Sequence, residues 1–181
     1  VWSDERNLVL GAAGHSVVDT NSGDSLILSG EIENSLELID QLKREGVQVE
    51  NTVLLAALRS WGLETTLKKL KGKFSFAWWS ASSEKLVIAR DRFGIHPMYW
   101  CSENEKGAIM FASEIKTLLA SGFIPRKVNK EAVIDYLRYS TVHGPLTIVD
   151  GIQLLEPGCA IEIQDETVNV FRWWETSNAV Y

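Results

Sequence analysis

The most constraining feature of the sequence is a pair of apolar segments joined by four small, mainly polar residues. In the first segment Phe74, Phe76 and Trp78 alternate with small or polar neighbours, and the second, residues 86–89, is continuously apolar. Alternation with a period of two is typical of β-strands, and residues 80–83 favour a turn between the two segments. The sequence therefore predicts an antiparallel hairpin near its centre.

The segment before this hairpin predicts a short strand followed by a helix. Residues 25–28 are apolar enough for a strand, which is expected to enter a turn at Ser29 and Gly30. Asn34 is then expected to cap a helix, with Glu37 completing a capping box.

Helical spacing of apolar residues predicts three further helices. One is expected to run from Thr52 to Gly62, and one over residues 114–120 with Ser113 as its cap. The third is expected over residues 130–139, capped by Asn129. On this last helix the buried side is expected to carry Val133, Ile134 and Leu137.

Two more hairpins complete the predicted elements. They are expected over residues 98–101 with 108–112, and over residues 160–163 with 168–173. Between the central hairpin and the next strand lies a polar segment with Arg90, Asp91 and Arg92, which suits either a network that orders the loop or a solvated turn. Paired strands with helices between them predict the α+β class, with helices covering the sheets.

Length and composition set the limits of this prediction. A chain of 181 residues buries about 70% of its unfolded surface, so residues 1–181 are expected to form a single domain without disulfides or metal. No uncharged apolar segment reaches the 18 or more residues of a membrane span, and no signal peptide is recognisable. No membrane partner is therefore expected.

Charge and cysteine content limit the cellular compartment and the kinds of binding partner that are expected. The net charge is −6 and the bases are scattered, apart from four lysines in residues 68–73, so nucleic acid is not an expected partner. Cys101 and Cys159 are far apart, and neither has a second Cys or His at metal-ligand spacing. Packed, reduced thiols in a cytoplasmic protein are expected, with no metal site.

No catalytic motif emerges from the residues alone. His15, Ser16 and Asp19 are too close in sequence to form a catalytic triad. The segment 11–14 (Gly-Ala-Ala-Gly) lacks both the lysine of a phosphate loop and the third glycine of a dinucleotide-binding loop. Composition and periodicity therefore predict only an α+β domain.

Three ordered motifs go further. They are residues 72–79 (GKFSFAWW), 89–100 (ARDRFGIHPMYW) and 111–119 (FASEIKTLL), and residues 29–34 (SGEIEN) support them. Together they resemble the glutaminase domain of the asparagine synthetase family, from about Leu8 to Trp174. The resemblance implies a class II, N-terminal-nucleophile amidotransferase fold, an αββα sandwich of antiparallel sheets. Such domains hydrolyse glutamine with a cysteine thiolate and pass ammonia to an ATP-dependent synthetase.

The resemblance also assigns positions to the binding site, and several of them differ from the family. Ser29 stands where the family has the asparagine that stabilises the oxyanion, whereas Gly30 and Glu31 are retained. Glu50 stands where an aspartate is expected, and its longer carboxylate would be displaced. In segment 11–14, Ala13 and Gly14 replace the arginines that would grip the glutamine carboxylate. The resemblance therefore makes glutamine binding doubtful.

The nucleophile has no counterpart in this chain. In the family it is the cysteine exposed at the amino terminus, whereas this sequence begins with Val1, so no catalytic residue is assigned. The chain is expected to be truncated at both ends relative to the family. It also lacks the Ser-Gly-Gly-x-Asp-Ser pyrophosphate loop, so ATP and Mg²⁺ are expected to bind a synthetase domain in a parent chain or a partner.

Three hypotheses for function follow. The first is a fragment of a working glutamine-hydrolysing asparagine synthetase. The second, which accounts for all the substitutions together, is a degenerate amidotransferase-like domain kept as a scaffold for an ATP-dependent, amide-forming synthetase. The third is a non-enzymatic interaction module, with the tryptophan pairs 78–79 and 173–174 as contacts, although such pairs more often lie in a core. The sequence also leaves open whether the chain forms a homodimer.

Overall fold

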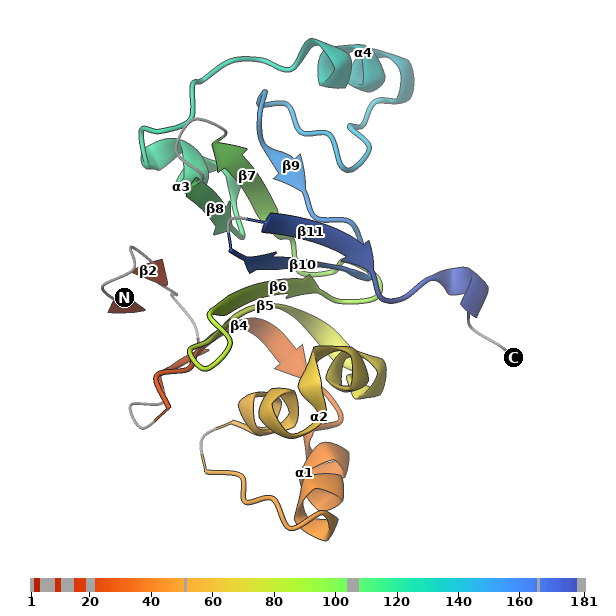
Figure 1. The fold of residues 1–181 in the computed structure, drawn as a ribbon. Helices are drawn as coiled ribbons and strands as arrows, with labels where there is room; N and C mark the ends of the chain where they lie inside the picture. The colour runs from red at the N-terminus through yellow and green to blue at the C-terminus, as the bar shows by residue number, and fades with distance from the viewer. Residues whose placement is uncertain are drawn as a thin grey trace. The chain divides into compact units, whose positions relative to one another are not determined.

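In the computed structural model the described residues are 2–3, 9–10, 15–18, 22–50, 52–103, 108–165 and 167–178. The chain divides into two compact units, one formed by residues 1–95 with 158–181 and the other by residues 96–157. Figure 1 shows their elements, and each unit is described by itself. No helix in the described ranges is long and apolar enough to span a membrane.

The first unit is built on a six-stranded antiparallel sheet with the strand order β11-β10-β6-β5-β4-β3. Two short strands, β1 (Trp2–Ser3) and β2 (Val9–Leu10), pair separately. A short 3₁₀ helix, Thr176–Asn178, follows the last strand. The strands of the large sheet are β3 (His15–Val18), β4 (Ser25–Ile32), β5 (Gly72–Ser80), β6 (Lys85–Arg90), β10 (Cys159–Gln164) and β11 (Thr167–Arg172).

The predicted central hairpin is confirmed as β5 and β6, which pair from Ser75 with Arg90 to Ser80 with Lys85. The period of two places Phe74, Phe76 and Trp78 on one face, where they join the core under the helices. The opposite face of β5 carries Ser75, Ala77 and Trp79, which are also buried. Both faces of β5 are thus withdrawn from solvent.

The predicted turn at Ser29 and Gly30 is wrong, because β4 continues as a strand to Ile32. Its last four residues pair with the start of β5, and Ile32 lies opposite Gly72. Gly72 permits this close pairing, since a Cβ at that position would come within 2.3 Å of the Glu31 carbonyl oxygen. The ladder with β5, which is distant in sequence, therefore overrides the local turn composition.

Helices α1 (Ser35–Arg44) and α2 (Val53–Lys69) cover one face of the large sheet (Figure 1). Thr52 caps α2, since its hydroxyl accepts a hydrogen bond from the Leu55 amide at 3.2 Å. Gly62, the predicted end of this helix, is instead a break with φ 73°, after which the helix resumes to Lys69. The buried core of this layer consists of Leu26, Ile32, Leu38, Leu54, Leu55, Leu58, Leu67, Leu70, Phe74, Phe76, Trp78, Val87, Ala89 and Ala160.

The predicted capping box at Asn34 does not form. Asn34 is the first residue before α1, but its side chain makes no capping hydrogen bond to that helix. Its amide nitrogen donates to the Lys69 carbonyl at 3.0 Å, and its carbonyl oxygen accepts from the Lys71 amide at 2.9 Å. Asn34 therefore ties the start of α1 to the end of α2.

The loop that follows β6 is ordered by its own charged residues. The Asp91 carboxylate is fully buried and accepts hydrogen bonds from the amides of Phe93 and Ile95 at 3.0 and 3.1 Å. Arg90 donates to the carbonyl of Gly94. Of the two interpretations of this segment, the ordering network is confirmed.

The second unit contains a three-stranded antiparallel sheet with the order β8-β7-β9 and two helices. Its small core contains Cys101, Leu118, Ile124 and Ile152. The predicted hairpin of β7 and β8 is confirmed. The elements are β7 (Tyr99–Glu103), β8 (Ala108–Ala112), α3 (Ile115–Ala120), α4 (Lys130–Tyr139) and β9 (Gln153–Leu154).

The two helices of this unit begin differently. Glu114 rather than Ser113 precedes α3, and no side chain caps it. Asn129 caps α4 as predicted, with its side-chain oxygen accepting from the amides of Glu131 and Ala132 at 3.0 and 3.3 Å. The predicted cap of α4 is therefore confirmed, and that of α3 is wrong.

The predicted buried side of α4 is wrong. Ala132 is the buried residue of this helix, whereas Ile134 is 50% exposed and Leu137 77% exposed. No residue of α4 belongs to the core cluster of this unit. The helix is amphipathic, but its apolar face is not covered by the described residues of its own unit.

Candidate functional site

The three consecutive residues Ser29, Gly30 and Glu31 lie on an open stretch of β4. Strand β3 pairs with β4 only as far as Leu28, so β4 has no described neighbour on that side beyond this point. All three residues are exposed although they belong to a strand with β5 on its other side. This three-residue motif therefore lies on the exposed end of β4 that is unpaired on the β3 side, the rim of the sheet.

The backbone at this rim has an unusual conformation. Gly30 has φ 99°, a region that residues with a side chain rarely adopt. Lys73 lies directly across from Glu31, but its ion pair is with Glu33, at 3.7 Å between nitrogen and oxygen. Within the described part of the chain Glu31 forms no ion pair, so its carboxylate remains available to a ligand.

The neighbour of Ser29 on strand β5 is a buried polar residue, Ser75. Ser75 is directly across from Ser29 on β5, and on its other side it faces Arg90 on β6. The Ser75 hydroxyl is buried and has no hydrogen-bond partner, and the same holds for Ser25 on the same face of β4. Sequence reasoning missed this polar row, because a serine within an alternating strand looks like an outward-facing residue.

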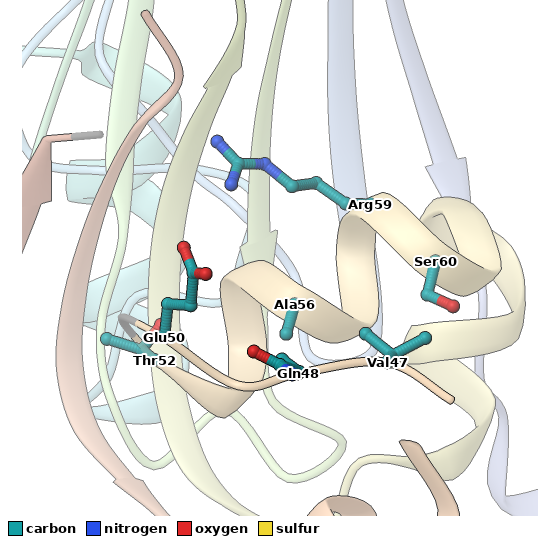
Figure 2. Close-up of a pocket in the computed structure, with 7 residues that line it drawn as sticks. All are labelled: Val47, Gln48, Glu50, Thr52, Ala56, Arg59 and Ser60. Carbon is teal, nitrogen blue, oxygen red and sulfur yellow. The ribbon is translucent and has the colours of Figure 1, made fainter. Parts of the chain in front are cut away.

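Glu50 lies elsewhere, at the entrance to α2. It lines an open hollow of about 270 Å³ together with Val47, Gln48, Thr52, Ala56, Arg59 and Ser60. Figure 2 shows the side chains of Glu50 and Arg59 extending to the same side of this hollow. Among the described residues that line it, Glu50 is the one that belongs to the predicted site.

Arg59 is held in place by partners of its own. Its Nε donates to the Asp24 carboxylate at 2.7 Å, and its terminal nitrogen donates to the Ser22 hydroxyl. The other oxygen of buried Asp24 accepts from the amide of Ala81 at 2.9 Å. This guanidinium and the nearby Glu50 give the hollow one fixed cation and one anion, which suits a small zwitterionic or polar ligand but supplies no nucleophile.

A second hollow, of about 390 Å³, lies between the second half of α2 and strands β10 and β11. It is lined by Leu63, Glu64, Lys68, Glu162, Asn169, Phe171, Arg172 and Trp173. Its lysine is paired with Glu64 one helical turn earlier, at 3.2 Å. No sequence motif predicted this hollow, since its residues come from segments almost a hundred positions apart.

The cysteines are packed thiols, as predicted. Cys101 is 6% exposed in β7 and Cys159 is 5% exposed in β10, and neither forms a disulfide. The Cys101 thiol donates weakly to the Met110 carbonyl at 3.9 Å. Neither lies on an exposed surface where a thiolate could attack a substrate.

His143 forms a surface pair with Asp135. Its backbone amide and its ring nitrogen Nδ1 lie 2.7 and 2.9 Å from the same carboxylate oxygen. These two hydrogen bonds, the amide first, lower the pKa of Asp135 from its ordinary value of 3.8. Both groups belong to the second unit, and within the described ranges no three His, Cys, Asp or Glu side chains gather as a metal site.

Some predicted positions fall outside the described residues. They are Ala13 and Gly14, with the rest of the segment 11–14, and Asp19. His15 and Ser16 form the start of the backbone of β3.

Comparison with known proteins identifies the family. A model of the glutamine amidotransferase domain matches residues 7–174. The chain belongs to the glutamine amidotransferase domain family. The domain is 30% identical, over 98% of its length, to asparagine synthetase [glutamine-hydrolyzing] 3 of Bacillus subtilis. It is 31% identical, over 90% of its length, to asparagine synthetase [glutamine-hydrolyzing] 1 of the same organism.

The amidotransferase domain spans only 31% and 27% of the length of these two relatives. Among solved structures it resembles the glutamine phosphoribosylpyrophosphate amidotransferase of B. subtilis, with a TM-score of 0.60 at 19% identity, over 92% of this chain and 34% of that chain. A likeness at this level shows the fold. The predicted α+β fold of antiparallel sheets, that of the N-terminal-nucleophile amidotransferases, is therefore confirmed.

Proposed function

We propose that this domain does not hydrolyse glutamine and serves as a scaffold for an ATP-dependent, amide-forming synthetase domain. The observation that carries the proposal is the rim of β4, where Gly30 and Glu31 of the family motif are present but Ser29 precedes them. Gly30 has a positive φ and Glu31 is exposed beside it.

The change at Ser29 affects the stabilisation of the oxyanion that forms when the amide is attacked. Attack on an amide places negative charge on its oxygen, and an asparagine side chain at this position would donate a hydrogen bond to it. The serine hydroxyl oxygen is bonded directly to Cβ, whereas the asparagine amide nitrogen is one carbon further out, so the hydroxyl does not reach the same point. Loss of one such donor costs about 10²–10³ in turnover.

Binding of the substrate is weakened independently. Glu50 stands where the family has the shorter aspartate, and Ala13 and Gly14 offer no guanidinium to a carboxylate. Each lost polar contact weakens binding by about 1–3 kcal/mol, and losses at three positions combine to leave little affinity for glutamine.

The rest of the fold supports a scaffold role. The core under α1 and α2 is complete, and the Asp91 network orders the loop after β6. ATP and Mg²⁺ would bind the partner domain, whose place is suggested by relatives three to four times as long as the matched segment.

A second candidate is supported by the same relatives. Their names describe glutamine-hydrolysing enzymes, so this chain is alternatively one portion of a working asparagine synthetase whose ammonia comes from glutamine. The third hypothesis, an interaction module, is less supported, because Trp78 and Trp79 are buried in β5 and cannot serve as surface contacts.

The decisive experiment measures both nitrogen sources on the native, full-length protein. Amide formation with ATP is expected from ammonium but not from glutamine, and no glutamate should be released. Glutamate release at ordinary enzymatic rates, about 1 s⁻¹ or more, would refute the proposal in favour of the second candidate. Intact-mass analysis and amino-terminal sequencing of the same sample would then show whether a cysteine stands at the mature terminus.

A further inference from the structure

The second hollow, of about 390 Å³, has apolar walls that the core holds in place. Leu63, Phe171 and Trp173 line it, and each of them packs against the buried core of the first unit while remaining partly accessible. Phe171 belongs to β11 and Trp173 follows that strand, so the two aromatic rings are supplied by neighbouring backbone. Apolar and aromatic walls on a fixed support are the usual lining of a small-molecule site.

Trp173 is fixed at one end of this hollow. Its backbone amide donates to the Gly158 carbonyl at 2.8 Å. The Arg92 guanidinium lies over its ring, 6.0 Å from the ring centre, and the same guanidinium donates to the Lys68 carbonyl at 3.0 Å. Because Arg92 contacts both residues, Trp173 and Lys68 lie at the same end of the hollow.

The hollow carries charges of both signs. Among the described residues that line it, the cations are Lys68 and Arg172 and the anions are Glu64 and Glu162, so the charges balance. Lys68 pairs with Glu64 at 3.2 Å, and both side chains are mostly exposed. Since an exposed pair of this kind contributes little stability, Lys68 exchanges its partner for a ligand carboxylate at low cost. A ligand with one anionic and one cationic group therefore matches the hollow better than a ligand with a single charge.

An uncharged polar side chain lies beside one of the anions. Asn169 on β11 is directly across from Glu162 on β10, and both line the hollow. Asn169 is exposed, and within the described part of the chain its side-chain amide forms no hydrogen bond. Glu162 pairs with Lys85 at 3.3 Å through one of its two oxygens. An amide carbonyl next to a carboxylate suits an ammonium group, which has three hydrogen atoms to donate.

We propose that this hollow binds a free α-amino acid with a large apolar side chain, for which L-phenylalanine is the probe. The ring of the ligand packs against the apolar walls, where aromatic side chains favour a second ring. Its ammonium group donates to Asn169 and Glu162, and its carboxylate accepts from Lys68, at the end marked by Trp173. The volume is near the lower end of the range for small-molecule sites, about 300–1,000 Å³, which fits a ligand of this size.

The proposal does not depend on whether the domain hydrolyses glutamine. In the sheet order β11-β10-β6-β5-β4-β3, four strand spacings separate β11 from β4, which is about 19 Å across the sheet. The described lining residues of this hollow are also different from those of the hollow that contains Glu50. Binding of an amino acid here is therefore measured separately from the reaction.

The test is a ligand-observed NMR titration of the native, full-length protein with L-phenylalanine and three analogues. L-Phenylalanine is expected to bind with a Kd of about 0.1–1 mM, the range for a ligand of about twelve non-hydrogen atoms. Phenethylamine lacks the carboxylate, 3-phenylpropanoate lacks the ammonium group, and glycine lacks the side chain. Each analogue should therefore bind at least about tenfold more weakly than L-phenylalanine.

Lys68→Met isolates the contact to the carboxylate. This variant should bind L-phenylalanine at least about fivefold more weakly, whereas its affinity for phenethylamine should not change, because that analogue has no carboxylate. The matched control is Lys116→Met, since Lys116 is also an exposed lysine paired with a glutamate, at 2.6 Å, and it lies on α3. The control should leave binding unchanged. Circular dichroism verifies that both variants are folded.

Three results would overturn the proposal. The first is no binding of L-phenylalanine below about 10 mM. The second is binding of phenethylamine or 3-phenylpropanoate as tight as that of L-phenylalanine, because the two charges of the ligand would then be irrelevant. The third is an equal effect of Lys68→Met and Lys116→Met on the affinity for L-phenylalanine.

Discussion

Removing the hydroxyl of Ser75 should stabilise the protein. This hydroxyl is buried in the middle of β5 and has no hydrogen-bond partner. On folding it gives up its hydrogen bonds to water and receives nothing in return, at a cost of about 1–3 kcal/mol. Ser75→Ala removes this cost and leaves a space of one oxygen atom, whose lost contacts amount to less than the roughly 0.8 kcal/mol of a buried methylene.

The expected net effect is a gain of about 1 kcal/mol in the free energy of unfolding, equivalent to a rise of about 2–4 °C in Tm for a chain of this size. Urea unfolding followed by tryptophan fluorescence measures it, because Trp78 and Trp79 lie on the same strand. The slope of free energy against urea should not change, since the same surface is exposed on unfolding.

Thr66→Val provides the matched control. Thr66 is as deeply buried as Ser75, but its hydroxyl donates to the Gly62 carbonyl at 2.6 Å, at the break within α2. Its removal should destabilise the protein by about 1 kcal/mol. The reasoning fails if Ser75→Ala destabilises the protein as much as Thr66→Val does, because the Ser75 hydroxyl must then have a partner such as an internal water molecule.

Three further predictions concern single positions. Asp91→Asn should cost about 2 kcal/mol, because a buried carboxylate that accepts two backbone amides is replaced by a weaker acceptor, and hydrogen exchange of those amides should accelerate. Gly72→Ala should lower the free energy of unfolding by more than about 1 kcal/mol, since the new Cβ would lie 2.3 Å from the Glu31 carbonyl oxygen and φ is 148°. Thermal unfolding measures this loss, and an unchanged Tm would count against the pairing of β4 with β5. Because the pKa of Asp135 is lowered in the folded state, its contribution is present above pH 3.8 and is lost as the pH falls through the lowered value. The amide resonance of His143 should therefore shift in that acidic range, and Asp135→Asn should abolish the shift.

The sequence predicted those elements whose determinants are local. The alternation of Phe74, Phe76 and Trp78 identified β5, because a period of two needs no information from other strands. Asn129 was identified as the cap of α4 for the same reason, since its side chain bonds to amides two and three residues later. The motifs around β5 and β6 then identified the family, and with it the fold.

Features that depend on distant partners were missed. Ser29 and Gly30 have the composition of a turn, but pairing with β5 keeps them in a strand. Asn34 looks like the start of a capping box, yet its amide bonds instead to a segment 35 residues away. Gly62 looks like the end of a helix and does break it, with φ 73° and ψ 174°, but burial of Leu67 and Leu70 in the core makes a second helical segment favourable beyond it.

The hollow at the entrance to α2 illustrates the same limit. Motif position assigned Glu50 to the binding site, but no motif indicates that Glu50 shares a hollow with Arg59. The hollow beside Arg59 depends on Asp24, whose role in fixing that guanidinium has no local signal.

Helix α4 shows why an amphipathic pattern is informative even where the burial prediction drawn from it is wrong. The pattern shows only that the helix has an apolar face, not which elements cover that face. Here Ala132 is buried, whereas Ile134 and Leu137 are exposed, as are Tyr136 and Tyr139. The spacing of apolar residues identified the helix correctly because that spacing is local. Which side of the helix is buried depends on elements outside it, and the pattern alone does not specify them.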